Sequence, residues 1–474
     1  MKRAITAGAA LLALAALPLA AQAESDVYEG FPVTVKGYEG AATTSVSYGG
    51  QIARHVLHDS LKKLAGTGSG AADPGLKAEM LAYYEGKEPG RAIVAPTSKG
   101  PFVVSQSAVD EISKGKELAG KTYKGAVPGM PNNMTGPELV SFWIDKASAA
   151  DKGVDAANGY DYPQLISKFL IGAVFYNQAV DKYLDEYLRA DTKPNDQPYK
   201  DGAAYTGKEH SWDEAFGYFG TPAHTLSLTP RAVYEIAKRG GKSETPEDAL
   251  AHADFDKDGA VDLKTEMTFA PAYYAASFDK SGTDYLHTIT RAFLYGRRLI
   301  ADADGAALSD AQRSALEDHA DTIRTNWEKV LAEAVFKYAG SVYRDLGKLE
   351  IILDASGDPA EAFRAYLKHW GELKGFALAL QTGRDNLGET AVRLNRIIGF
   401  GPVLPNASQV TDIDSRGNYV KDESKPLSTY QYDMLKLQAL MVSAFGVEAR
   451  QNDQRAELES LLEKLGDGAS AEND

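Results

Sequence analysis

Residues 162–188 read Y-P-Q-L-I-S-K-F-L-I-G-A-V-F-Y-N-Q-A-V-D-K-Y-L-D-E-Y-L. Apolar side chains recur through this stretch at helical spacing and give it a broad apolar face. A helix with such a face is stable when it is buried among other helices. The stretch therefore predicts a long helix over Tyr162–Leu188 and a bundle around it.

The sequence on both sides of this stretch continues the helical pattern. Proline in the first turn, capping boxes and terminal glycines mark many of the helix ends. The predicted fold is all-α, a large multi-helix bundle or two packed bundles, with a short extended segment before Tyr48. Pro402–Pro426 is predicted to be a loop or a small hairpin. The other expected helices cover Gly49–Leu64, Pro74–Tyr84, Ala108–Leu118, Pro137–Ala150, Thr206–Gly220, Thr229–Arg239, Thr245–Ala253, Asp262–Phe278, Thr283–Ala303, Ser309–Leu353, Asp358–Gly383, Pro426–Gly446 and Glu448–Leu465.

The first 23 residues have the organisation of a secretory signal peptide. Lys2 and Arg3 precede an apolar run, and Ala21-Gln22-Ala23 fits a cleavage site, so a mature chain is expected to start at Glu24. We expect a periplasmic or secreted protein. The remaining chain is predicted to form an N-terminal helical half (24–250), a C-terminal helical half (251–466) and a disordered tail (467–474).

Composition excludes several classes of function. The 474-residue chain has a formal net charge of −15 and no cysteine. An acidic surface repels nucleic acid and favours cations. Without cysteine there are no disulfides, thiolate metal sites or lipid-modified N-terminal cysteine, so a lipoprotein is excluded. No later stretch is apolar and long enough to span a membrane.

The stretch Thr206–Gly220, T-G-K-E-H-S-W-D-E-A-F-G-Y-F-G, carries the first candidate site. Within this predicted helix, His210, Asp213 and Glu214 stand at i, i+3 and i+4 and therefore share one face. An imidazole and two carboxylates on one face could bind a metal ion or relay a proton. The alternative is a surface helix with a partly buried histidine and solvated acids.

A second helical His/acid pair, His369 and Glu372, occurs in H-W-G-E. Helix bundles commonly build metal sites from side chains on facing helices. We therefore predict that the two His-bearing helices face one another and share a divalent transition metal. Imidazole with carboxylate suits iron, manganese or zinc, of which iron or zinc is the expected cofactor.

The stretch Asp254–Glu266, D-F-D-K-D-G-A-V-D-L-K-T-E, has the spacing of an EF-hand calcium loop. Carboxylates stand at positions 1, 3, 5 and 9, glycine at 6 and a carbonyl donor at 7. Thr265 takes position 12, where the bidentate glutamate belongs, and Glu266 follows one residue later. Calcium binding is one interpretation, and an acidic turn whose Asp262 caps the next helix is the other. The predicted calcium ligands are Asp254, Asp256, Asp258, Ala260, Asp262 and Glu266.

Four stretches together resemble an exported bacterial family known as domain of unknown function 4856. They are Ser47–Gln51, Lys168–Leu188, Glu209–Gly220 and Val261–Glu266. More distantly, the chain is similar to the imelysin-like proteins, helical periplasmic or outer-membrane proteins with a G-x-H-x-x-E motif. On that resemblance His210 corresponds to the motif histidine, with Asp213 at the acid position and Gly207 three residues before the histidine rather than two. The resemblance implies a role in iron uptake.

Three functions follow as hypotheses. The first is a non-enzymatic metal-handling accessory in periplasmic iron or metal acquisition, whose partners are a metal ion and an outer-membrane transport component. The second is a metallopeptidase-like enzyme with Glu214 as general base and a metal on His210. The third is a calcium-stabilised scaffold or interaction protein. The sequence lacks H-E-x-x-H, the motif typical of zincin peptidases.

Overall fold

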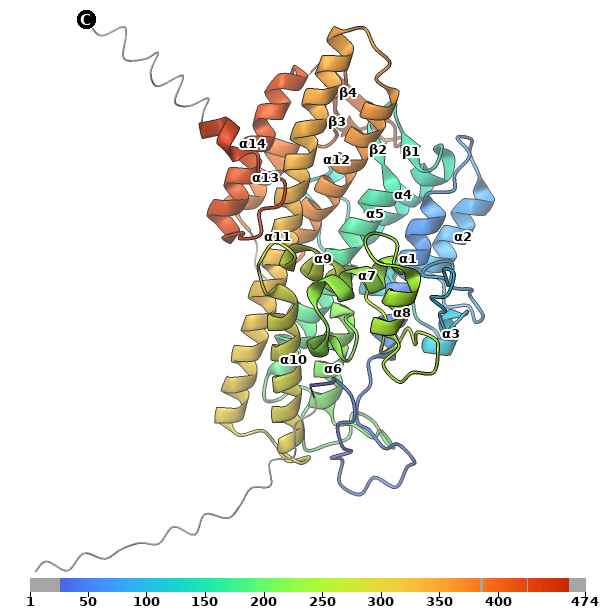
Figure 1. Ribbon diagram of the computed structural model, residues 1–474, viewed down its shortest axis with the longest axis vertical. Coiled ribbons are helices and arrows are strands. Elements are labelled where there is room, and N and C mark those ends of the chain that lie inside the picture. The colour runs from blue at the N-terminus through green and yellow to red at the C-terminus, as the bar shows by residue number, and fades with distance from the viewer. Residues whose placement is uncertain (1–25, 384–386, 424, 460–474) are drawn as a thin grey trace, which may run out of the picture.

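The structure is a computed structural model that describes residues 26–383, 387–423 and 425–459. Helices dominate these residues, and they pack side by side along the long axis of the molecule (Figure 1). The predicted helical fold is therefore confirmed. The predicted signal peptide and C-terminal tail lie outside the described residues.

The first group of helices surrounds α5, the start of the stretch that predicted the fold. Its members are α1 (Gly49–Ala65), α2 (Pro74–Tyr84), α3 (Val109–Ile112), α4 (Gly136–Ala149) and α5 (Tyr162–Leu170). Asp161 caps α5 by accepting a hydrogen bond from the backbone N–H of Gln164. Every residue from Tyr162 to Leu170 except Gln164 is buried. The apolar face is thus used as the sequence predicted.

The predicted helix over Tyr162–Leu188 does not continue as one α-helix. After α5 the backbone widens into π-helical turns over Ile171–Tyr176 and Gln178–Tyr183. Gly172 lies against α12, where a side-chain Cβ would be 2.4 Å from that of Ala379. The close contact with another helix explains why a residue without a side chain stands here.

The middle group of helices carries the first candidate site. It consists of α6 (Gly207–Phe219), α7 (Pro230–Lys238), α8 (Pro246–Ala253), α9 (Ala270–Asp279) and α10 (Tyr285–Asp302). The helix predicted over Asp262–Phe278 begins only at Ala270. Residues 263–266 form a turn and 267–269 are irregular, because the backbone N–H of Phe269 donates to the carbonyl of Gly220 and Pro271 has no N–H to continue a helix.

The longest helix, α11 (Asp310–Asp354), runs along the long axis of the molecule (Figure 1). It packs against α10 toward one end and against α12 and α14 toward the other. The C-terminal group is completed by α12 (Ala360–Leu380), α13 (Glu389–Ile398) and α14 (Leu427–Phe445).

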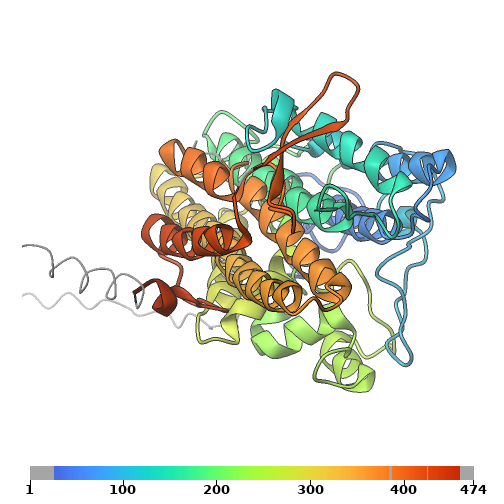
Figure 2. The same ribbon diagram turned by 90° about the horizontal axis from the view of Figure 1, so that it is seen from above.

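Strands are short in the described residues. β1 (Val154–Asp155) pairs with β2 (Tyr160–Asp161), and β3 (Ser408–Ile413) pairs with β4 (Tyr419–Glu423), both antiparallel. The second pair is the hairpin predicted within Pro402–Pro426, and it projects from the helices in Figure 2. Segment 26–48 is extended but contains no strand. Short 3₁₀ turns cover Ala119–Lys121, Pro131–Asn133, Glu186–Leu188 and Thr225–Ser227.

One hydrophobic core extends through the described part of the chain, from Tyr28 to Val447. Helices from both predicted halves contribute to the same contacts, since α5 packs against α12 and α6 against α10. Helices on both sides of residue 250 share this core, and the division into two halves stays a prediction.

Candidate metal sites

The helix α6 begins and ends where the sequence predicted. Thr206 accepts a hydrogen bond from the backbone N–H of Glu209, and the Glu209 side chain accepts one from the backbone N–H of Thr206. Gly220 ends the helix with φ +68°, a left-handed conformation that favours glycine. These caps fix which side chains of α6 face the core.

Asp213 faces a buried arginine rather than a metal pocket. Its Oδ1 accepts hydrogen bonds from Arg297 Nε and from the Tyr28 hydroxyl, both at 2.9 Å, and its Oδ2 accepts one from the backbone N–H of Ser47 at 3.0 Å. Burial raises the pKa of the Asp213 carboxyl, and the Arg297 charge opposes that rise. Asp213 is thus fully engaged as the partner of a buried cation.

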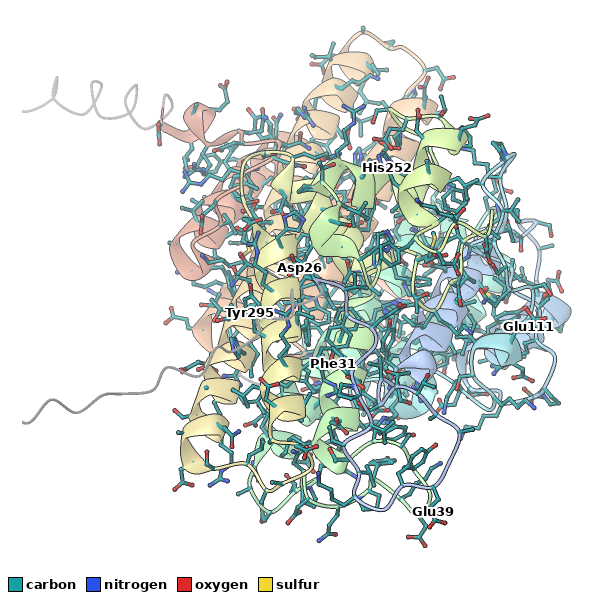
Figure 3. The ribbon with its side chains drawn as sticks, turned by 60° about the horizontal axis from the view of Figure 1, so that its bottom comes forward. Asp26, Phe31, Glu39, Glu111, His252 and Tyr295 are labelled. Carbon is teal, nitrogen blue, oxygen red and sulfur yellow. The ribbon has the colours of Figure 1, made fainter. Side chains whose placement is uncertain are left out.

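Glu209 completes this buried network. Arg297 Nη1 lies 3.1 Å from Glu209 Oε1, and both side chains are fully buried. The same oxygen accepts hydrogen bonds from the hydroxyls of Thr34 and Ser45. Phe31, labelled in Figure 3, covers the guanidinium at 4.7 Å. The network therefore attaches the extended N-terminal segment to α6 and α10, a structural role that sequence spacing could not reveal.

His210 and Glu214 lie on a different side of α6 and form a pair. His210 Nε2 is 3.7 Å from Glu214 Oε1, which also accepts a hydrogen bond from Gln51. The His210 ring stacks on Tyr205, with ring centroids 4.5 Å apart, and also contacts Tyr199. Burial lowers the pKa of His210, and the Glu214 charge opposes that change. A mostly neutral imidazole beside a carboxylate could accept a metal ion.

His369 and Glu372 project from α12 toward other partners. His369 Nδ1 lies 2.6 Å from Asp345 Oδ2 on α11. Glu372 Oε1 accepts a hydrogen bond from the Tyr338 hydroxyl and lies 4.0 Å from Lys168 Nζ. Both residues line a cavity that contains neither His210 nor Glu214.

The predicted pocket shared by the two His-bearing helices is therefore not formed. Of the residues described, the set whose ligand atoms approach as a group of three or more is Asp254, Asp256 and Glu266. The reason lies in the packing: α6 contacts α1 and α10, whereas α12 contacts α5 and α11. We had predicted that these two helices face each other. Sequence periodicity shows which side of a helix is buried, but it carries no information on which helices pack together.

Hydrogen bonds from backbone N–H groups close the first half of the loop Asp254–Glu266. His252, labelled in Figure 3, lies in the last turn of α8, directly before it. Asp254 accepts hydrogen bonds from the backbone N–H groups of Asp258 and Gly259, each at 3.0 Å. Gly259 has φ +89°, as the turn at position 6 requires.

Glu266 occupies the place of the displaced position-12 ligand. Its Oε1 accepts hydrogen bonds from the backbone N–H of Phe255 and Asp256, and its Oε2 accepts one from that of Asp262. One ligand atom each from Asp254, Asp256 and Glu266 falls within 4.8 Å of the others. Burial raises the pKa of Glu266. The one-residue offset therefore does not remove the glutamate from the loop.

The other predicted calcium ligands are placed less directly. Asp258 Oδ1 accepts a hydrogen bond from the N–H of Ala260 at 2.8 Å. Asp262 Oδ1 accepts one from Gln106 at 2.8 Å and one from the N–H of Lys264. Asp258, Ala260 and Asp262 lie outside the group of three carboxylates, and Oδ1 of Asp262 already accepts the hydrogen bonds that anchor the loop.

Two contacts that the sequence did not indicate complete the surroundings of the loop. Val261 pairs with the segment Val103–Ser105, donating to the carbonyl of Val103 and accepting from the N–H of Ser105. Glu29 approaches from the N-terminal segment: burial raises its pKa, and the charges of Asp262 and Asp256 raise it further. Glu29 thus adds a carboxylate near the loop from more than 200 residues away.

These features define the class of protein: a mostly helical protein with a carboxylate-rich loop at its surface and a buried arginine–carboxylate network. A family model described as "Domain of unknown function (DUF4856)" matches residues 146–236 of the chain. The segment contains α5 and α6 but not the acidic loop. No curated protein and no solved structure matches the chain. None of the helices in the described part of the chain is long and apolar enough to cross a membrane.

Proposed function

We propose that this protein is a calcium-binding helical scaffold whose cation is held by the loop Asp254–Glu266. The proposal rests on the convergence of Asp254, Asp256 and Glu266, whose ligand atoms lie within 4.8 Å of one another. Calcium takes six to eight oxygen ligands at about 2.3–2.6 Å in flexible geometry, which suits carboxylates on a turn. The carbonyl of Ala260, the second oxygen of Asp262 and water would complete the shell.

The bound cation would hold two distant parts of the chain together. The loop pairs with Val103–Ser105 through Val261, and Gln106 bonds to Asp262 and to the N–H of Leu263. Clustered carboxylates repel one another, and a divalent ion removes that repulsion. Calcium is therefore expected to stabilise the contact between α8, the loop and segment 103–106.

Calorimetric titration and thermal unfolding with calcium test this proposal. Added calcium should raise the unfolding temperature, because a ligand that binds the folded state stabilises it. Asp256→Asn, which keeps the size of the side chain, should weaken binding by about tenfold or more. The matched control is Asp201→Asn, an exposed aspartate in the loop before α6. Absence of a calcium response in the unmodified protein would refute the proposal.

A transition-metal site at His210 and Glu214 is the second candidate. It is supported by the 3.7 Å approach of an imidazole nitrogen and a carboxylate oxygen that are both largely shielded from solvent. With the resemblance to imelysin-like proteins, this pair supports a role as an accessory in periplasmic iron or metal acquisition. Elemental analysis of natively purified protein tests it: iron or zinc should be present and should disappear in His210→Ala.

The metallopeptidase hypothesis needs a metal with an open position and Glu214 free to act as a base. Glu214 already accepts a hydrogen bond of 2.7 Å from Gln51, which favours a structural role for this carboxylate. Protein loaded with zinc or iron is expected to leave casein intact. Cleavage that is lost in Glu214→Gln would reverse that expectation.

A further inference from the structure

A cavity of about 810 Å³ lies between α1, α5, α7, α9, α11 and α12. Its volume falls in the range of small-molecule sites in proteins. Nine lysine and arginine side chains line it, against two carboxylates, those of Asp59 and Glu372. This excess of positive charge stands in a chain whose formal net charge is −15. The cavity is therefore opposite in sign to the protein as a whole.

Lys168 is the buried member of the nine cations, whereas Lys63, Lys242, Arg344 and Lys368 are exposed to solvent. Within the described residues, the only one of the nine with a carboxylate in ion-pair range is Lys168, which lies 4.0 Å from Glu372. Lys168 is 4 % exposed, and its ammonium group faces the rings of Tyr274 and Phe376 at 5.5 and 6.0 Å. Buried charges in proteins are almost always paired. The arrangement thus leaves a positive charge without adequate compensation.

The electrostatic state of the lysines agrees with this geometry. Burial lowers the pKa of Lys168, and the neighbouring Lys62 lowers it further. Burial also lowers the pKa of Lys238 to about 8, again with a contribution from Lys62, and lowers the pKa of Lys337. These ammonium groups come from α1, α5, α7 and α11, so four separate helices direct positive charge into one space. An anion in that space would oppose each of these shifts.

Aromatic side chains form another part of the wall. The rings of Tyr234 and Tyr273 stack with centroids 5.0 Å apart, and Lys238 Nζ lies 4.2 Å from the centroid of Tyr273. Tyr274 and Tyr338 also line the cavity. Cavities that bind organic ligands combine such rings with a few charged groups that orient the ligand. A bare inorganic ion would leave the aromatic wall without a contact.

We propose that this cavity binds a small organic molecule that carries two or more anionic groups, either carboxylates or phosphates. The anionic groups would contact Lys62, Lys168 and Lys238, and the carbon skeleton would lie against Tyr234 and Tyr273. The argument for this proposal does not rest on calcium at the acidic loop, because none of these five residues belongs to that loop.

Calorimetric titration of the full chain with sodium citrate and with sodium pyrophosphate tests the proposal, in buffer freed of divalent ions so that chelation does not contribute. At least one of the two anions should bind, and its affinity should fall as salt is added. Tighter binding of citrate assigns a polycarboxylate, and tighter binding of pyrophosphate assigns a phosphorylated ligand. Equal binding supports recognition by charge alone.

Two variants locate the binding. Lys62→Gln and Lys238→Gln each remove a cation that no carboxylate pairs with, so neither leaves a new buried charge. Each substitution should weaken binding of the anion by about tenfold, the loss expected for one hydrogen bond to a charged group. Lys200→Gln, an exposed lysine outside the cavity, is the control. Circular dichroism verifies that the variants are folded. The proposal is wrong if neither anion binds at 10 mM, on the order of ten times a weak 1 mM dissociation constant, or if the cavity variants bind as the control does.

Discussion

Removal of the buried Arg297 side chain should strongly destabilise the protein. Its guanidinium is fully buried and bonded to Asp213, Glu209 and Ser45. Arg297→Ala would leave two carboxylates buried without their cation, and breaking such a buried pair costs about 3–5 kcal/mol of stability. Arg291→Ala, on the same helix but in an exposed pair with Asp284, should cost less than about 1 kcal/mol. Urea unfolding of both variants measures the difference, and equal losses would contradict the structural role of the network.

His55 gives the protein a specific dependence on pH. Its Nε2 lies 3.1 Å from the carbonyl oxygens of Gly217 and Tyr218, and burial lowers the pKa of its ring to about 3. In the unfolded chain the His55 imidazole takes up a proton near its ordinary pKa of about 6.5, whereas in the folded chain it stays neutral at that pH. Stability should therefore be fully present above pH 6.5 and fall by about 1.4 kcal/mol for each pH unit from 6.5 toward 3.

His55→Gln, which cannot take up a proton, provides the comparison for this pH dependence. Urea unfolding at several pH values should give a shallower loss of stability below pH 6.5 for the variant than for the unmodified protein. Parallel curves would show that His55 is protonated equally well in the folded and unfolded chains.

For single residues, the sequence predicted the roles that depend only on residues nearby in the chain. The capping pair Thr206 and Glu209 and the terminal Gly220 needed only local spacing. The role of Asp213 could not be predicted, because its partner Arg297 stands 84 residues away. The same holds for Lys62 and Lys238, which only the packing of α1 and α7 brings to one cavity.

At the scale of elements, the contact between the π-helical turn and α12 sets how closely two helices approach. A Cβ on Gly172 would lie 2.4 Å from Ala379 Cβ and 2.5 Å from its carbonyl oxygen. Gly172→Ala should therefore destabilise the protein by about 1–3 kcal/mol. Gly347→Ala on α11 would meet only the flexible end of Gln431 and should change stability by less than about 1 kcal/mol. Thermal unfolding distinguishes the two, and a neutral Gly172→Ala would show that α12 can move away.

The positions of helices were predicted better than their geometry. The hydrophobic pattern located α5 and the residues after it, but the change to π-helical turns comes from packing on α12, which no local pattern records. The helix expected from Asp262 failed for a related reason. The backbone N–H of Phe269 donates to the carbonyl of Gly220, far away in the sequence, and Pro271 has no N–H to continue the helix.

At the scale of the whole molecule, the sequence predicted the class of fold and the acidic loop but not which helices face each other. The His/acid pairs of α6 and α12 were correct as neighbours along each helix and wrong as partners across the bundle. Their separation follows from α11, which packs beside α10 toward one end and α12 toward the other (Figure 1). A cavity assembled from six helices is a property of that arrangement alone.

The backbone of the segment Met267–Ala270 is held at both ends. Its first residue follows Glu266, which the acidic loop holds, and the backbone N–H of Phe269 donates to the carbonyl of Gly220 at 2.8 Å. All four residues line the cationic cavity. A calcium ion that immobilises Glu266 should therefore also immobilise one wall of the cationic cavity, which we propose binds an anion. Calcium should slow deuterium uptake across residues 267–270. Calcium should then raise the affinity for the anion, and the anion should raise the affinity for calcium by the same factor, as thermodynamic reciprocity demands.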